Sequence, residues 1–144
     1  MSKKSLFLVI IQFSCFAFFA FDGVFKTNHW LFYIQIIGFL LAVWGVLVMK
    51  MGNFNVQPEV KNNANIVKKG PYKIIRNPMY SGIILFIGVA IITDFTYLRL
   101  SIFMLLTLVL LLKIFMEETF MEERFGKEYL DYKQSTYRLL PFVY

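Results

Sequence analysis

The chain has 144 residues, of which 58% are hydrophobic, 19% aromatic and 17% charged, with a net charge of +6. Soluble domains usually carry about 25% charged residues, so this composition excludes a disordered chain and argues against a water-soluble fold. A single cysteine, Cys15, excludes a disulfide framework, and a single histidine, His29, excludes a histidine-rich zinc site. We therefore expect one all-α membrane domain covering residues 1–144, with no metal site.

Four apolar stretches are predicted to cross the membrane as a helical bundle, because a helix needs about 20 mostly apolar residues to span ~30 Å of hydrocarbon. They cover residues 5–21, 30–49, 79–97 and 98–116. The third stretch is the weakest, since its uninterrupted apolar run covers only 83–93. The third and fourth are separated by a short turn near Asp94, which predicts a helical hairpin.

The first stretch has an alternative interpretation as a cleaved signal peptide, because Lys3 and Lys4 precede it and small residues lie near its end. Its apolar run is longer than that of a typical signal peptide. We therefore expect residues 5–21 to remain as a membrane helix.

Lysine and arginine are distributed very unequally between the two sides of this bundle. If the N-terminus is cytoplasmic, thirteen of the fifteen lie on the cytoplasmic side, and only Lys26 and Arg99 lie on the other. Cytoplasmic flanks of membrane helices are enriched in these residues. We therefore predict that both termini are cytoplasmic, in the inner membrane if the host is bacterial. The +6 charge then reflects topology and not binding to nucleic acid.

Two long polar segments, residues 50–78 and 117–144, then lie on the cytoplasmic side, where we expect the chemistry. The first is rich in Asn, Gly and Pro and is predicted to be a loop. Asn77 and Pro78 are typical of the N-cap and first turn of the third helix. A helix N-terminus beside Tyr80 can bind a carboxylate or a polar heterocycle, although Asn-Pro also fits a helix start without a ligand.

The second segment follows a lysine in the last turns of the fourth stretch. Lys113, Glu117 and Met121 are spaced four residues apart, which places them on one helix face. A lysine at this depth usually has a functional role or extends its charge to the membrane interface. The alternative is that Lys113 forms an intrahelical ion pair with Glu117. Gly126 is predicted to break the helix, and we expect Arg138 to contact lipid phosphates.

The two polar segments together resemble the isoprenylcysteine carboxyl methyltransferase family and, more broadly, its phospholipid methyltransferase relatives. The family pattern G-x-Y…R-H-P-x-Y-x-G is similar to Gly70-Pro71-Tyr72 followed by Arg76-Asn77-Pro78-Met79-Tyr80-Ser81-Gly82. The family pattern of a Glu pair, F-G-x-x-Y-x-x-Y and a terminal proline is similar to Glu117-Glu118, Phe125-Gly126, Tyr129, Tyr132 and Pro141. The likeness covers about residues 50–144, and the first two stretches match only in being hydrophobic.

The resemblance implies an enzyme that transfers a methyl group from S-adenosylmethionine, which it binds without a Rossmann domain. It implies cofactor contacts from Gln57, Ala64, Asn65, Ile66, Val67, Tyr72, Asn77, Pro78, Met79, Tyr80 and Glu117. It also implies that Lys113 faces a lipophilic methyl acceptor that enters from the bilayer, among the membrane lipids. Glu118 lies about 100° around the helix from Glu117, and either contacts the acceptor or closes the pocket from outside.

Two residues depart from the family pattern. Asn77 replaces a histidine and cannot titrate near neutral pH, so no general base is available there. Lys113 replaces an arginine and can hold a carboxylate only as a point charge. A carboxylate has a pKa near ~4 and needs no base, whereas an amine would need deprotonation and would be repelled by Lys113.

The sequence therefore favours carboxyl O-methylation of a lipophilic, isoprenylcysteine-like acceptor. Two alternatives stay open: a phospholipid or other small-lipid N- or O-methyltransferase, and a non-catalytic membrane scaffold that has lost the reaction. The departures at Asn77 and Lys113 motivate the second alternative. Nothing in the sequence indicates the oligomeric state.

Overall fold

The computed structural model describes residues 3–23, 30–50 and 65–141. These residues form five α-helices and one 3₁₀ helix: α1 (Lys3–Asp22), α2 (Phe32–Lys50), η1 (Gly70–Lys73), α3 (Pro78–Thr93), α4 (Tyr97–Phe125) and α5 (Lys127–Gln134). Within the described ranges there is no strand, only a single parallel bridge between Ile75 and Tyr137. The predicted all-α helical bundle is confirmed.

Three helices, α1, α2 and α4, are long and apolar enough to cross a membrane. Helix α3 is also apolar but has 16 residues, which corresponds to a length of about 24 Å. The expected third stretch, 79–97, is therefore too long: α3 ends at Thr93, because Asp94 begins the turn to α4. The side chain of Thr96 caps α4 by accepting a hydrogen bond from Arg99 N at 3.2 Å. The predicted hairpin is confirmed with this shorter first helix.

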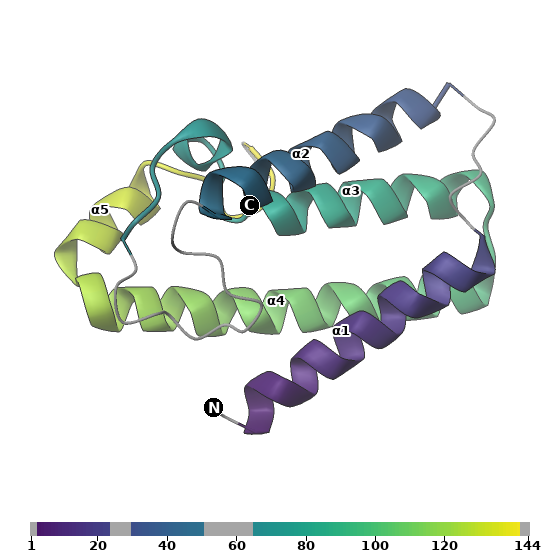
Figure 1. Cartoon of the computed structure of the whole chain (residues 1–144), viewed down its shortest axis with the longest axis horizontal. Coiled ribbons are helices and arrows are strands. Elements are labelled where there is room, and N and C mark those ends of the chain that lie inside the picture. The colour runs from purple at the N-terminus through teal and green to yellow at the C-terminus, as the bar shows by residue number, and fades with distance from the viewer. Residues whose placement is uncertain (1–2, 24–29, 51–64, 142–144) are drawn as a thin grey trace.

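The membrane helices are arranged as two pairs, α1 with α4 and α2 with α3 (Figure 1). In the second pair the backbones approach closely, because glycine leaves room for them. A Cβ atom at Gly82 would lie 2.5 Å from the carbonyl oxygen of Gly38 and 2.5 Å from Ala42 N. Small residues at a helix interface permit such close contacts within a membrane.

Gly82→Ala is expected to destabilise the protein by about 1–3 kcal/mol, because the added methyl group forces α2 and α3 apart. The measurement is thermal unfolding of the purified protein in detergent. Gly88→Ala is the matched control on α3, since a Cβ atom there would come no closer than 3.4 Å to a neighbouring atom, Phe103 Cζ. Equal unfolding midpoints for the two variants would contradict a close α2–α3 contact.

The polar segments pack against each other at the end of the bundle that carries α5, and we call residues 65–77 and 117–141 the head region. Arg76 N donates to Tyr137 O at 2.8 Å, and Tyr137 N donates to Ile74 O at 2.9 Å. Gly126 separates α4 from α5 with a φ of +52°, which confirms the predicted break. The segment before α3 and the C-terminal segment are thus joined by backbone hydrogen bonds.

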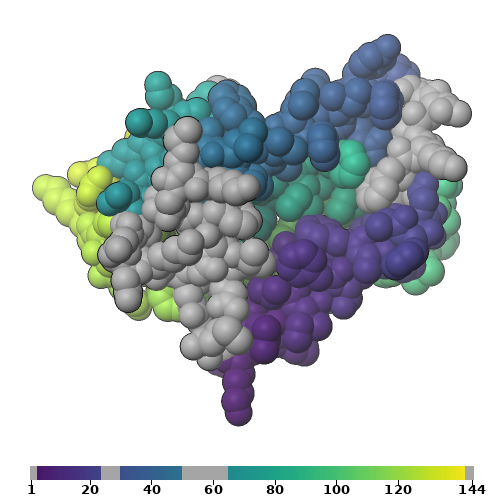
Figure 2. Space-filling model, viewed as in Figure 1, coloured from purple at the N-terminus to yellow at the C-terminus, as the bar shows by residue number. Residues whose placement is uncertain are grey.

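At the opposite end of the bundle, Arg99 joins the two helix pairs. Its Nε donates to Asp22 Oδ2 at the end of α1, at 2.5 Å, and its guanidinium also pairs with Asp94 in the α3–α4 turn. Between the two ends, large apolar side chains of α1 and α2 lie on the surface, where both helices are visible in Figure 2. Phe7, Ile37 and Trp44 are each more than half exposed, as expected for helices that face lipid.

Candidate active site

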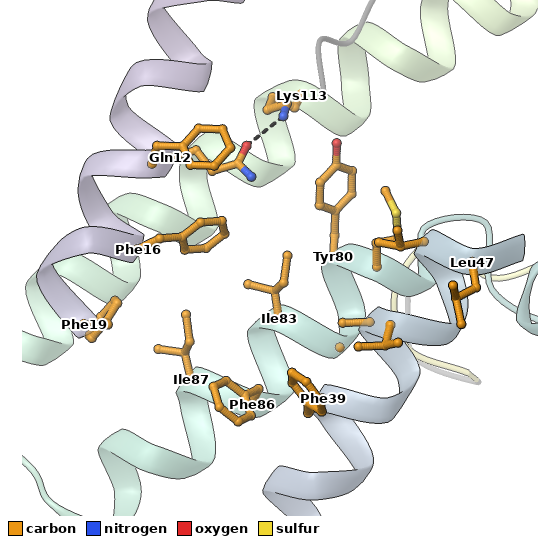
Figure 3. Close-up of a pocket in the computed structure, with 16 residues that line it drawn as sticks. Gln12, Phe16, Phe19, Phe39, Leu47, Tyr80, Ile83, Phe86, Ile87 and Lys113 are labelled. Carbon is orange, nitrogen blue, oxygen red and sulfur yellow. Dashed lines mark hydrogen bonds between the residues drawn. The ribbon is translucent and has the colours of Figure 1, made fainter. Parts of the chain in front are cut away.

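A cavity of about 440 Å³ lies between the two helix pairs (Figure 3). Most of its wall is apolar, with aromatic side chains from Phe13, Phe16 and Phe19 of α1, Phe39 of α2 and Phe86 of α3. Its polar lining groups, Gln12, Tyr80 and Lys113, lie together at one end (Figure 3). An apolar pocket with a few convergent polar groups is typical of small-molecule sites, and this distribution suits an amphiphilic ligand.

The cavity reaches the apolar surface of the bundle. Phe13, Phe39 and Leu47 line it, yet these side chains are 53%, 54% and 58% exposed. Within the described residues, the cavity is therefore open toward the side where α1 and α2 would contact lipid. An apolar molecule could enter it sideways from a bilayer.

Lys113 brings a cation to the polar end of the cavity. The residue is 1% exposed, and its Nζ donates to Gln12 Oε1 at 2.7 Å. Nζ also lies 5.7 Å from the centroid of the Tyr80 ring. A charged side chain within an apolar membrane domain is costly and usually functional, and at this position the ammonium group could bind a ligand that carries negative charge.

Glu117 lies one turn beyond Lys113 on α4 and accepts a hydrogen bond from Tyr80 Oη at 2.5 Å. Tyr80 therefore touches both charged residues, which are expected to face one side of the helix. No lysine or arginine among the described residues lies within salt-bridge distance of the Glu117 carboxylate. A partly buried carboxylate whose direct partner is a phenol can accept a cationic ligand.

Tyr72 lies close to this acid and is held by two hydrogen bonds. Its Oη donates to Gly45 O at 3.3 Å, and its carbonyl accepts from Tyr132 Oη at 2.7 Å. Burial, together with the negative charge of Glu117, raises the pKa of the Tyr72 phenol above its ordinary value. Burial also raises the pKa of Tyr132 to about 12. Both phenols therefore stay protonated and act as hydrogen-bond donors at neutral pH.

The start of α3 lies beside these residues. Met79 lines the cavity and Pro78 is buried in the first turn of the helix. Asn77 occupies the N-cap position without a capping hydrogen bond, because its Nδ2 donates to Arg138 O at 3.1 Å. Its amide therefore connects the start of α3 to the C-terminal segment.

Among the described residues that the resemblance implies as cofactor contacts, Met79 and Tyr80 line the cavity, whereas Tyr72, Asn77, Pro78 and Glu117 do not. Residues 65–67 precede η1 in a non-helical segment, and none of them lines it. Gln57 and Ala64 lie outside the described residues.

Glu118 points into the head region and is not among the residues that line the cavity. Its carboxylate, 5% exposed, binds Arg76 Nε at 3.1 Å and Arg138 Nη2 at 2.8 Å, with Lys133 Nζ at 3.7 Å. We call Arg76, Glu118, Lys133 and Arg138 the ion cluster. The expectation that Arg138 contacts lipid phosphates is wrong, because its guanidinium binds Glu118 and lies over the ring of Phe115.

Sequence reasoning missed Gln12 as a member of the site. One indication was present, since Gln12 is an amide within the apolar run 5–21, and polar side chains inside membrane helices are often functional. Its partner Lys113 lies 101 positions away. No local pattern in the sequence indicates that these two residues meet.

Comparison with protein families gives one match that covers most of the chain. The family model described as phospholipid methyltransferase (PEMT) matches residues 28–128. The matched region contains Tyr80, Lys113 and Glu117, whereas α1 and Gln12 precede it. No individual curated protein matches the chain.

Proposed function

We propose that this chain, which belongs to the phospholipid methyltransferase family, methylates the carboxylate of a lipophilic acceptor. The family is that of isoprenylcysteine carboxyl methyltransferase-like proteins. Membership and three helices that can span a bilayer make it a membrane protein of a methyltransferase family. The observation that supports a carboxylate acceptor is the buried Lys113 at the polar end of an otherwise apolar cavity.

The residues beside Tyr80 fit S-adenosylmethionine as methyl donor. When bound, this cofactor supplies an electrophilic methyl group on a cationic sulfonium, and it also carries an ammonium group. Glu117, partly buried and hydrogen-bonded to Tyr80, has the charge to hold a cation, and Tyr72 and Tyr80 offer aromatic rings for it. We assign cofactor binding to these three residues and the start of α3, completed by Gln57 and residues 64–67.

Lys113 holds the acceptor in this proposal. A carboxylate is ionised at neutral pH and needs no general base, which agrees with the absence of a histidine at position 77. Lys113 and Glu117 are one helical turn apart and both contact Tyr80, so the ligands that they hold are neighbours. The protein then promotes the reaction by alignment and by placement of charge.

The apolar part of the cavity takes the acceptor's tail, which enters from the bilayer between α1 and α2. We place the head region on the cytoplasmic side, because thirteen of the fifteen lysines and arginines then lie there. The cofactor reaches Glu117 from that side. The methyl acceptor thus approaches the site from the bilayer, and the cofactor approaches it from the cytoplasm.

Calorimetric titration with S-adenosylhomocysteine tests this function. We expect saturable binding to the purified wild-type protein and at least about tenfold weaker binding to Glu117→Gln, because the variant loses a charge-assisted contact. Glu123→Gln is the control, since Glu123 is an exposed acid on the same helix. Absence of binding to folded wild-type protein would contradict the proposal and favour a non-catalytic scaffold.

A further inference from the structure

Gln12 is a buried amide in the middle of α1, and within the described part of the chain only its oxygen forms a hydrogen bond. The residue is 7% exposed, and its Oε1 accepts a hydrogen bond from Lys113 Nζ at 2.7 Å. Its Nε2 has no hydrogen-bond partner among the described residues. Figure 3 shows this nitrogen at the polar end of the cavity, beside Lys113.

The orientation of the amide follows from its partner. An ammonium group can only donate hydrogen bonds, so the amide oxygen must face Lys113 and the NH₂ group must point elsewhere. Burial of an amide without hydrogen bonds costs free energy. An NH₂ group directed into a cavity is therefore suited to a ligand that supplies a hydrogen-bond acceptor.

We propose that Gln12 and Lys113 form a two-donor site for the carboxylate of the methyl acceptor. Lys113 donates to one carboxylate oxygen and Gln12 Nε2 donates to the other. A lysine alone provides a point charge without a fixed direction, and the amide adds the second, oriented donor. This inference rests on the proposed function and identifies the residue that selects the acceptor's head group.

The consequence is that α1, which precedes the matched residues 28–128, takes part in substrate selection. A fatty alcohol of the same chain length offers one oxygen, and a fatty amine in its cationic form offers no acceptor at all. Gln12 should therefore favour an acid over an alcohol with the same tail. The apolar wall of the cavity does not distinguish between these molecules.

The test measures binding of radiolabelled dodecanoate to the full-length protein in nanodiscs, with competition by unlabelled dodecanoate or dodecanol. We expect Gln12→Leu to weaken dodecanoate binding about tenfold, since it loses a hydrogen bond to a charged group. Dodecanol binding should change by less than about threefold. Gln35→Leu is the matched control, because Gln35 is 1% exposed in α2 but does not line the cavity.

The ratio of acid to alcohol affinity separates recognition from structural damage, because a collapsed cavity would weaken both ligands equally. Equal dodecanoate affinity in the wild type and Gln12→Leu overturns the inference, as does a wild type that binds the alcohol as tightly as the acid. Titration of the same samples with S-adenosylhomocysteine reports on the proposed function separately. Cofactor binding without Gln12-dependent acid binding would leave that function standing and remove Gln12 from it.

Discussion

Lys113→Met is expected to lower kcat/KM for a lipid acid about 100-fold, because truncation of one partner of a buried charge pair costs several kcal/mol. The variant removes the ammonium group from the polar end of the cavity, so the acceptor's carboxylate loses its charged partner. Methionine is apolar and similar in length, so the α1–α4 contact should persist. The measurement is the initial rate of transfer of a labelled methyl group to the acid in nanodiscs.

Two controls define the meaning of this result. S-adenosylhomocysteine should bind Lys113→Met within about twofold of its affinity for the wild type, because cofactor binding is assigned to Glu117 and its neighbours. Lys127→Met removes the same charge from an exposed position on α5 and should leave the rate unchanged. If Lys113→Met instead lost cofactor binding, Lys113 would belong to the cofactor site and the proposed division of roles would be wrong.

Glu118→Gln is expected to destabilise the head region by about 3–5 kcal/mol, because it leaves buried guanidinium groups without their carboxylate. Arg76 and Arg138, with side chains 7% and 16% exposed, both bind this carboxylate. The measurements are thermal unfolding and hydrogen exchange. We expect faster exchange at the amides of Arg76 and Tyr137, whose hydrogen bonds join the two parts of the head region.

Glu128→Gln is the matched control, because Glu128 forms an exposed ion pair with Lys68 at 2.9 Å. Exposed pairs contribute little, about 0–1 kcal/mol, so its unfolding midpoint should stay near that of the wild type. If Glu118→Gln abolished methyl transfer without a change in stability or exchange, Glu118 would act on the acceptor directly. If the ion cluster instead holds the head region in place, Glu118→Gln should lower the stability and speed the exchange.

The helices could be predicted from the sequence because membrane helices depend on local apolar length. The apolar runs at 5–21 and 30–49 correspond closely to α1 and α2. Helix α3 ended earlier than expected because Asp94 and Thr96 form a turn and a cap, which hydropathy does not detect. Tyr80 belongs to the first motif of the resemblance and Glu117 to the second, and a hydrogen bond joins the two residues. The roles of these residues remain predictions.

The sequence could not indicate which surfaces of the helices face each other. In a membrane, a lipid-facing surface and a buried surface are both apolar, so periodicity does not reveal the face of α1 that meets α4. Gln12 was therefore missed. Arg138 was assigned to lipid because its partner, Glu118, lies 20 positions earlier and across the α4–α5 break. Both errors concern contacts that depend on tertiary structure.

Polar side chains join α1 to α4 at two described positions, Asp22 to Arg99 and Gln12 to Lys113. These positions are ten residues apart, about 15 Å along the helix, and Phe13, Phe16 and Phe19 of the cavity wall lie between them. The stretch of α1 that borders the tail is thus fixed at both of its ends. Arg99 lies at the opposite end of the bundle from the head region, so we expect it to affect only the width available to the tail, whereas Lys113 is also proposed to bind the head. A variant of Arg99 is therefore expected to alter the preference for the tail alone, whereas a variant of Lys113 is expected to alter the fit of both the tail and the head.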